Sequence, residues 1–229
     1  MKLQFHGHAC FSIFTESGTH LLIDPFLTGN SQATISADDL SPDVILLTHG
    51  HWDHIGDTAS IAKRTNCLVL CNPEIITYLK SKGVANFHGM NIGGGYQFDW
   101  GYAKMTPALH SSAIEDQGQL IPLGNPAGFL LQIDGKTIYH AGDTGLSYEM
   151  TLLGNANRID LALLPIGGNF TMDIKDAMLA ARALHARQVI PMHYNTFPVI
   201  EQNANFFSNQ LLNYGIPCPV LQPEESITL

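Results

Sequence analysis

The sequence predicts an α/β fold built as a four-layer αββα sandwich, in which two mixed β-sheets pack face to face and helices cover both outer faces. Short β-branched and apolar runs alternate with helical patterns, and Gly or Pro residues separate them. A meander of strands followed by βαβ units occurs in the first half of the chain and again in the second half. At 229 residues, 45% of them hydrophobic, the chain is long enough to form one such domain over residues 1–229.

The first half of the chain supplies the first sheet and two of the outer helices. Its predicted strands cover residues 3–5, 10–15, 20–24, 44–48 and 68–71. One helix is expected over residues 57–64. A second begins at Pro73, where a proline suits the first helical position after the candidate N-cap Asn72, and ends at Gly83.

The second half repeats this order of elements. After the glycine-rich turn at residues 93–95, strands are expected at 96–98 and 103–108, followed by a hairpin in GFLLQIDGKTIYHAGD around the turn signal Asp134-Gly135. Buried strands at 161–165 and 189–191 flank a helix over 173–186, and another helix follows over 200–214. Residues 220–221 are expected to close the sheet.

Composition excludes several classes of function. The net charge is −9 with neutral histidines, and no Lys/Arg cluster interrupts it, so a long nucleic acid is not an expected partner. No apolar run has the length of a membrane span and no signal-peptide core follows Met1, so we expect a cytoplasmic protein without a membrane anchor. The four cysteines lack zinc-ribbon spacing and are expected to be buried free thiols.

The stretch THGHWDHIGD, which follows a predicted buried strand, concentrates candidate metal ligands. In an extended segment His49, His51 and Asp53 project to one side, and the turn into the next helix brings His54 beside Asp53. Neutral imidazoles and a carboxylate that converge on one point suit zinc, and also iron or manganese. The pattern H-x-H-x-D-H therefore indicates a metal site more strongly than a chance cluster of polar loop residues.

Three further candidates lie where other predicted strands end. His110 ends KMTPALH, Asp143 ends TIYHAGD and His193 ends VIPMH. Each alone is more typical of a capping or core residue. Like the first cluster, however, all three lie where a buried strand gives way to a loop. A catalytic metal site takes its ligands from several such loops, so the shared position supports a common site.

These residues resemble the metal-binding motifs of the metallo-β-lactamase-fold hydrolase superfamily. The phrases LLIDPF, THGHWDHIGD, YHAGDT, GGNFTM and PMHYNTFP are similar to those of small metal-dependent hydrolases related to ascorbate-6-phosphate lactonase. The resemblance implies one metal bound by His49, His51 and His110, a second bound by Asp53, His54 and His193, and Asp143 bridging both. All seven positions match.

This ligand set implies hydrolysis by a metal-bound hydroxide. Two divalent cations about 3.5–4 Å apart share a water, lower its pKa and stabilise charge on the attacked group. Zinc is the expected metal, with manganese or iron as alternatives. Asp53 is the candidate proton acceptor because it faces the bridging water, and no Ser or Cys nucleophile is required.

Other residues are expected to support the metals or contact substrate. Asp24, at the end of a strand, is the first choice to orient a metal-bound histidine. His8 is expected to line the site, although His6 and His8 are equally typical of a strand edge, and His140 is a weaker candidate. The proposed substrate contacts are Asn169 and Thr171 in the Gly-Gly turn before a helix, with the polar loop after His110 beside them. Asn195, Thr196 and Phe197, which follow His193, are expected to line the same mouth.

The sequence leaves three classes of function open. A metal-dependent hydrolase acting on a small polar metabolite, with a lactone or phosphodiester bond favoured, is the leading interpretation. A mononuclear iron oxidoreductase similar to persulfide dioxygenases is the second, since such enzymes also carry H-x-H-x-D-H. A non-catalytic binding protein is the third, and the complete ligand set disfavours it.

Overall fold

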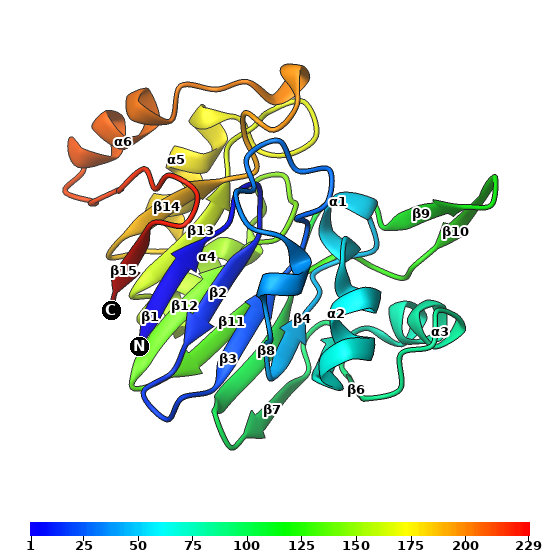
Figure 1. Cartoon of the computed structure of the whole chain (residues 1–229). Helices are drawn as coiled ribbons and strands as arrows, with labels where there is room; N and C mark the ends of the chain where they lie inside the picture. Colours follow the sequence, from blue (N-terminus) through cyan, green and yellow to red (C-terminus); the bar gives the residue numbers. More distant parts are fainter.

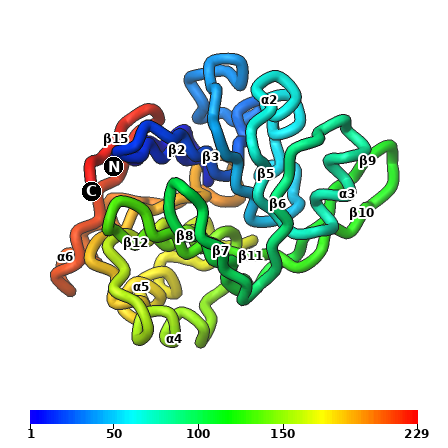
Figure 2. Tube along the Cα trace, turned by 90° about the horizontal axis from the view of Figure 1, so that it is seen from below, coloured from blue at the N-terminus to red at the C-terminus, as the bar shows by residue number.

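The computed structural model of the protein describes residues 1–229 and contains two large mixed β-sheets that face each other (Figure 1). Seen from below, the sheets form two inner layers, with α2 and α3 outside the first sheet and α4 and α5 outside the second (Figure 2). This arrangement confirms the predicted αββα sandwich. The termini lie close together, and Leu229 donates its backbone N–H to the carbonyl oxygen of Met1.

The first sheet has seven strands in the order β15-β1-β2-β3-β4-β5-β6. They are β1 (Lys2–Phe5), β2 (Phe11–Phe14), β3 (His20–Ile23), β4 (Val44–Leu46), β5 (Leu68–Cys71), β6 (Phe87–Gly89) and β15 (Ser226–Thr228). Strands β3 to β6 run parallel, whereas β15, β1, β2 and β3 pair antiparallel. The sheet is therefore mixed.

The second sheet has six strands in the order β14-β13-β12-β11-β8-β7, and a separate hairpin pairs β9 with β10. The strands are β7 (Gly95–Phe98), β8 (Gly101–Pro107), β9 (Ala113–Asp116), β10 (Gln119–Pro122), β11 (Ala127–Ile133), β12 (Lys136–His140), β13 (Leu161–Pro165) and β14 (Val189–Met192). Strands β12, β13 and β14 are parallel and the others antiparallel.

Six α-helices and two short 3₁₀ helices connect the strands. They are α1 (Trp52–Ile55), α2 (Thr58–Thr65), α3 (Pro73–Ser81), α4 (Glu149–Ala156), α5 (Ile174–Ala183), α6 (Ala204–Leu212), η1 (Ala37–Asp39) and η2 (Pro198–Ile200). Helix α3 begins as its sequence predicts, because the Asn72 side chain accepts a hydrogen bond from the Ile75 backbone. None of the helices is long and apolar enough to cross a lipid bilayer.

Alternation along the strands produces the layers. In β3, Leu21 and Ile23 belong to a cluster of 44 residues that fills the space between the sheets and extends to α5 and α6, whereas Leu22 belongs to a cluster of 16 residues beneath α2 and α3. Strand β5 divides in the same way, with Leu70 facing the centre and Val69 facing the helices. Both faces of the first sheet are therefore buried, as its apolar strands require. All four cysteines are free and buried, as predicted.

Several parts of the sequence prediction differ from the structure. The helix expected over residues 200–214 begins only at Ala204, after η2, and β6 and α4 were not predicted. Residues 220–221 form no strand; β15 closes the first sheet instead by pairing with β1. Pro217 and Pro219 lack the N–H groups that a ladder needs, so this segment packs along the sheet through Leu221 without strand pairing. The polar loop after His110 contains the β9–β10 hairpin, which projects away from the sandwich (Figure 1).

Candidate metal centre

Loops and the short helix α1 at one edge of the sandwich carry all seven predicted metal ligands. Strands β4, β8, β12 and β14 all end there, and the strand order places these ends on the two facing sheets. The ligands are His49, His51, Asp53 and His54 after β4, His110 after β8, Asp143 after β12 and His193 after β14. The structure brings all seven together, and their potential ligand atoms fall into two main groups.

The first group contains His49, His51, His110 and Asp143, whose ligand atoms lie within 4.8 Å of one another. The Nδ1 atom of His51 lies 3.0 Å from Nε2 of His49 and 3.2 Å from Nε2 of His110. A pair of ring nitrogens this close can have only one proton between them. Where three ring nitrogens converge, some of their lone pairs must therefore face one another. A cation between them removes this repulsion.

The second group contains His8, Asp53, His54 and His193. Nε2 of His193 lies 3.8 Å from Oδ2 of Asp53, and Nε2 of His8 lies 3.2 Å from the same oxygen. Asp53 and His54 come from helix α1, which begins directly after His51 and turns both side chains into the site.

Asp143 lies between the two groups. Its Oδ1 is 3.3 Å from Nε2 of His54, and its Oδ2 is 2.9 Å from Nε2 of His193 and 3.5 Å from Nε2 of His110. The side chain is only 2% exposed. One carboxylate thus contacts histidines of both groups from a buried position.

Unpaired polar atoms provide a test of whether a metal fits. Nε2 of His54, Oδ1 of Asp143 and both ring nitrogens of His193 are buried without a hydrogen bond. Buried polar atoms are normally paired, because an unpaired one costs about 1–3 kcal/mol. Nitrogen and carboxylate donors that converge here suit zinc, manganese or iron, so the residues fit a divalent cation.

Asp24, predicted as a supporting residue, holds the metal-site loop from beneath. Its fully buried carboxylate accepts hydrogen bonds from the Thr48 backbone (2.9 Å), the Thr48 hydroxyl (2.6 Å) and Nδ1 of His54 (2.7 Å). The Thr48 hydroxyl also lies 2.9 Å from Nδ1 of His49. These contacts leave the Nε2 atoms of His49 and His54 directed into the site.

His8 also lies in the site, and both of its ring nitrogens have hydrogen-bond partners. Its Nδ1 is 2.8 Å from the hydroxyl of Thr196, and its Nε2 faces Asp53. His8, Asp24 and His193 all have left-handed backbone, with φ of 56°, 45° and 55°. Such conformations are costly for residues other than glycine and concentrate at functional sites. Here the bond from the His193 N–H to the His8 carbonyl, 2.8 Å, joins two of them.

Electrostatics divides the buried histidines into two protonation classes. Burial and the neighbouring His193 lower the pKa of His8 to about 4, so its imidazole is neutral. Burial acts in the same direction on His54, but the carboxylates of Asp143 and Asp24 outweigh it and raise the pKa of His54 well above its usual value. Asp53 is buried, yet its hydrogen bond from His8 and the charge of His54 hold its pKa far below the ordinary range. Such a low pKa makes Asp53 a weak base.

Three supporting residues were not predicted from the sequence. Thr48 connects Asp24 to His49, and Thr196 supports His8, as described above. The Ser112 hydroxyl accepts a hydrogen bond from the Gly50 N–H (3.0 Å) and donates one to the Leu123 carbonyl (3.1 Å), which anchors the loop between His49 and His51. The position of Thr48 directly before the first histidine was the available signal; the other two depend on contacts distant in sequence.

The remaining histidines lie outside the two groups. His6 contacts Glu224 and Ser12 at 2.8 and 2.7 Å, and the Ser12 hydroxyl also contacts His20. His140 is buried, with Nε2 donating to the Ala9 carbonyl and Nδ1 accepting from the Gly142 N–H, two residues along the chain. It therefore supports the turn that leads to Asp143.

A cavity of about 530 Å³ opens over the histidine groups. Its lining comprises His51, Trp52, Asp53, His110, Ser111, Asp143, Phe170, His193, Phe197 and Val199. The predicted substrate contacts Asn169, Thr171 and Asn195 are not part of this lining. Phe197 lines the cavity as predicted, together with Phe170 from the Gly-Gly turn and Val199 from the loop after β14. The N–H groups of Gly168, Phe170 and Thr171 form hydrogen bonds within the turn, so these three do not face an anion.

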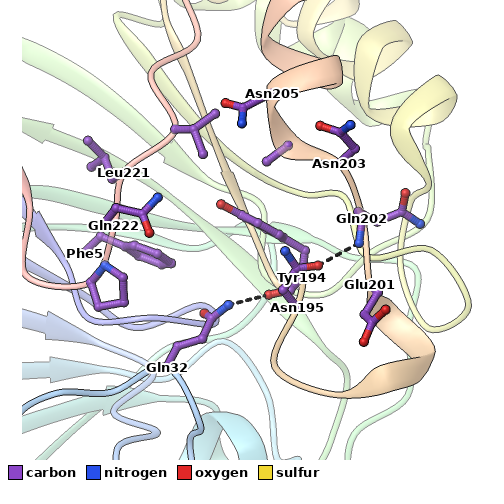
Figure 3. A pocket seen from close by; sticks show the side chains of 13 residues that line it. Phe5, Gln32, Tyr194, Asn195, Glu201, Gln202, Asn203, Asn205, Leu221 and Gln222 are labelled. Carbon is purple, nitrogen blue, oxygen red and sulfur yellow. Dashed lines mark hydrogen bonds between the residues drawn. The ribbon is translucent and has the colours of Figure 1, made fainter.

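A second cavity of about 790 Å³, drawn in Figure 3, has none of the seven candidate metal ligands in its lining. Asn195 lines this one, and its side-chain oxygen accepts a hydrogen bond from the Gln202 backbone at 2.7 Å. Gln32 reaches from the opposite wall, donating to the Tyr194 carbonyl and accepting from the His8 N–H, both at 2.9 Å. These bonds fix the backbone of the loops that carry His8 and His193.

The fold and the His/Asp cluster define a metallohydrolase of the metallo-β-lactamase fold, and comparisons with known proteins agree. A model of the β-lactamase superfamily domain matches residues 2–193. The metal-dependent hydrolase YtkL of Bacillus subtilis is 53% identical over 213 residues, which cover 92% of this chain and 93% of YtkL. A relative from Geobacillus thermodenitrificans is 52% identical over 230 residues, with both chains fully covered. The protein belongs to this family, UPF0173, of metal-dependent hydrolases and is an enzyme.

Solved structures give the same assignment. Igni18, described as a metallo hydrolase from the archaeon Ignicoccus hospitalis, superposes with a TM-score of 0.90 at 38% identity, covering 100% of this chain and 97% of Igni18. An isothiocyanate hydrolase from Delia radicum gut bacteria superposes with a TM-score of 0.80 at 19% identity, over 100% of this chain and 99% of the hydrolase. At that identity the likeness concerns the fold alone.

Proposed function

We propose that the protein binds two divalent cations, with zinc as the preferred metal, and uses them to hydrolyse a small-molecule substrate. His49, His51 and His110 hold one cation, and Asp53, His54 and His193 hold the other. The observation that carries this proposal is the position of Asp143, a buried carboxylate in contact with histidines of both groups. A site for only one metal would not require a carboxylate between two histidine groups.

When bound, a pair of divalent cations acidifies a shared water and stabilises negative charge on the attacked group. The protein positions the ligands. Asp24 and Thr48 fix the tautomers of His54 and His49, so that the nitrogens facing the site carry lone pairs. The hydrogen bond from Nε2 of His8 to Oδ2 of Asp53 fixes the orientation of the Asp53 carboxylate beside His193. The low pKa of Asp53 favours the role of ligand over that of proton acceptor.

The bond that is cleaved is proposed to be a lactone or a phosphodiester, with the lactone preferred. No Lys or Arg lines the cavity, so an anionic phosphate would have only the cations as partners. The same lack of basic side chains, with the net charge of −9, supports a small-molecule partner over a long nucleic acid. Four free, buried thiols fit the reducing cytoplasm, which is the proposed location.

The test is a hydrolysis screen of zinc-loaded and manganese-loaded protein on lactones, thioesters and phosphodiesters. His49→Ala is expected to abolish turnover, whereas His185→Ala, an exposed histidine outside the site, is expected to retain it. Turnover that survives His49→Ala would contradict the proposal. A single iron per chain with no hydrolysis would favour the mononuclear oxidoreductase instead.

A further inference from the structure

The cavity over the metal site has an unusually apolar mouth. Besides the candidate ligands, its lining consists of Trp52, Phe170, Phe197, Val199 and one polar residue, Ser111. Trp52 is 55% exposed, Phe170 53% and Val199 55%. Large apolar side chains that gather around one cavity while remaining open to water are typical of a binding surface rather than of a protein exterior.

One wall of this mouth is already ordered. The Trp52 ring packs against Phe26 at a centroid distance of 5.1 Å and against Phe197 at 5.6 Å. Phe197 in turn contacts the ring of His8 at 5.5 Å. Because these rings support one another and rest on a residue of the metal site, binding a ligand there requires little further ordering of side chains.

The mouth offers nothing to a charged group on the substrate. No cationic side chain is part of the lining, and its only carboxylates, Asp53 and Asp143, face the metal positions. A carboxylate or phosphate on the part of the substrate remote from the metals would lose hydration without gaining an ion pair. An alkyl or aryl group would instead cover exposed rings.

We infer that the substrate carries an uncharged alkyl or aryl group next to the scissile bond, and that Trp52, Phe170, Phe197 and Val199 bind it. This inference rests on the proposed function, because it assumes that the metals hold the reacting end. It also changes the expectation from the sequence, which favoured a small polar metabolite. A lactone with an alkyl side chain has the required chemistry.

Binding of hydroxamates to the zinc-loaded protein tests the inference without requiring turnover. Acetohydroxamate, hexanohydroxamate and octanohydroxamate share a metal-binding head and differ in alkyl length. Suberic monohydroxamate has the length of the octanoyl compound but ends in a carboxylate. Each methylene that is fully buried improves binding by about fourfold. Since the mouth is open on one side, we expect roughly twofold per methylene by calorimetry, and the terminal carboxylate should remove most of the gain.

Phe170→Ala should flatten this dependence on chain length and leave acetohydroxamate binding within about twofold, since it removes apolar area but no ligand. Phe206→Ala is the matched control, because Phe206 is 51% exposed on α6 outside this cavity. Dissociation constants that do not depend on alkyl length, or tighter binding of suberic monohydroxamate, would overturn the inference. Chain-length-dependent binding without hydrolysis of any ester or lactone would overturn the proposed function, while still supporting the binding of an alkyl group by Trp52, Phe170, Phe197 and Val199.

Discussion

Replacing Asp24 with Asn should weaken the second metal position without changing the shape of the site. One carboxylate oxygen accepts the Thr48 N–H, and the other accepts both the Thr48 hydroxyl and Nδ1–H of His54. An Asn amide places an NH₂ group against one of these sets of donors. The Thr48 hydroxyl can rotate to accept, but His54 accepts at Nδ1 only when its proton moves to Nε2. That nitrogen faces Asp143 and the proposed cation.

The expected losses of metal affinity and of folding stability follow from the hydrogen bonds that Asp24 makes beneath the ligands. Loss of a group that orients a metal-bound histidine lowers metal affinity by about 10- to 100-fold. Loss of a charge-assisted hydrogen bond at a fully buried site costs about 2–3 kcal/mol of folding free energy. In a chain of this length that corresponds to a fall in Tm of roughly 4 to 12 °C in the metal-free protein.

Competition with a chromophoric zinc chelator measures the affinity, and scanning calorimetry of the metal-free protein measures Tm. Asp57→Asn is the matched control. The Asp57 carboxylate also accepts two backbone hydrogen bonds, from Leu27 and Thr28, but contacts none of the histidines. It should lower Tm and leave zinc affinity unchanged. Wild-type affinity for both zinc ions in Asp24→Asn would refute the reasoning.

Three further predictions concern charge, protons and backbone. Asp143→Asn removes a negative charge that is worth about 4 kcal/mol against a unit charge at 4 Å. The affinity for one metal should therefore fall by about three orders of magnitude, or that metal should be lost, and turnover should fall similarly. Two metals per chain by mass spectrometry together with normal turnover would exclude the bridge. The raised pKa of His54 keeps this side chain protonated in the metal-free protein at neutral pH. Zinc binding should therefore release a proton and become tighter as the pH rises towards that pKa. Calorimetry in buffers of different ionisation enthalpy measures the proton release, and a value of zero would contradict the prediction. Gly56→Ala should lower the free energy of unfolding by at least about 2 kcal/mol, because Gly56 has φ 41° and an added methyl group would collide with the Pro25 carbonyl. Gly118→Ala is the control, since a methyl group added there meets no neighbouring atom, and it should cost only about 1 kcal/mol. Urea unfolding measures both.

Much of the fold was readable from local patterns. Strands such as β5 and β13 are continuous apolar runs bounded by turn residues, and helix α3 carries its own N-cap and proline. The seven candidate ligands share a simple signal, since each lies just after the end of a strand, and strand ends on facing sheets meet at one edge. Local sequence therefore indicated both the layers and the site.

The remaining features depend on contacts between distant segments. Strand β15 forms only because β1 offers a free edge, and its short SIT sequence carries no signal of its own. Thr196 and Ser112 gain their roles from His8 and Gly50, which lie 188 and 62 residues away in the chain. The candidate substrate-contacting residues were mostly Asn and Thr side chains, together with Phe197. Of the residues expected to line the mouth, Phe197 lines the cavity, whereas Phe170 does so in place of its neighbours Asn169 and Thr171, because turn geometry determines which residue of a loop points inward.

The number of metals bound per chain tests the central claim most directly. Wild-type protein supplemented with zinc and then freed of excess metal by gel filtration should carry two zinc ions per chain by elemental mass spectrometry. His110→Ala and His193→Ala, one from each group, should each lower this number to one. Wild-type protein that retains no metal, or variants that both retain two, would contradict the account of a dinuclear site bridged by Asp143.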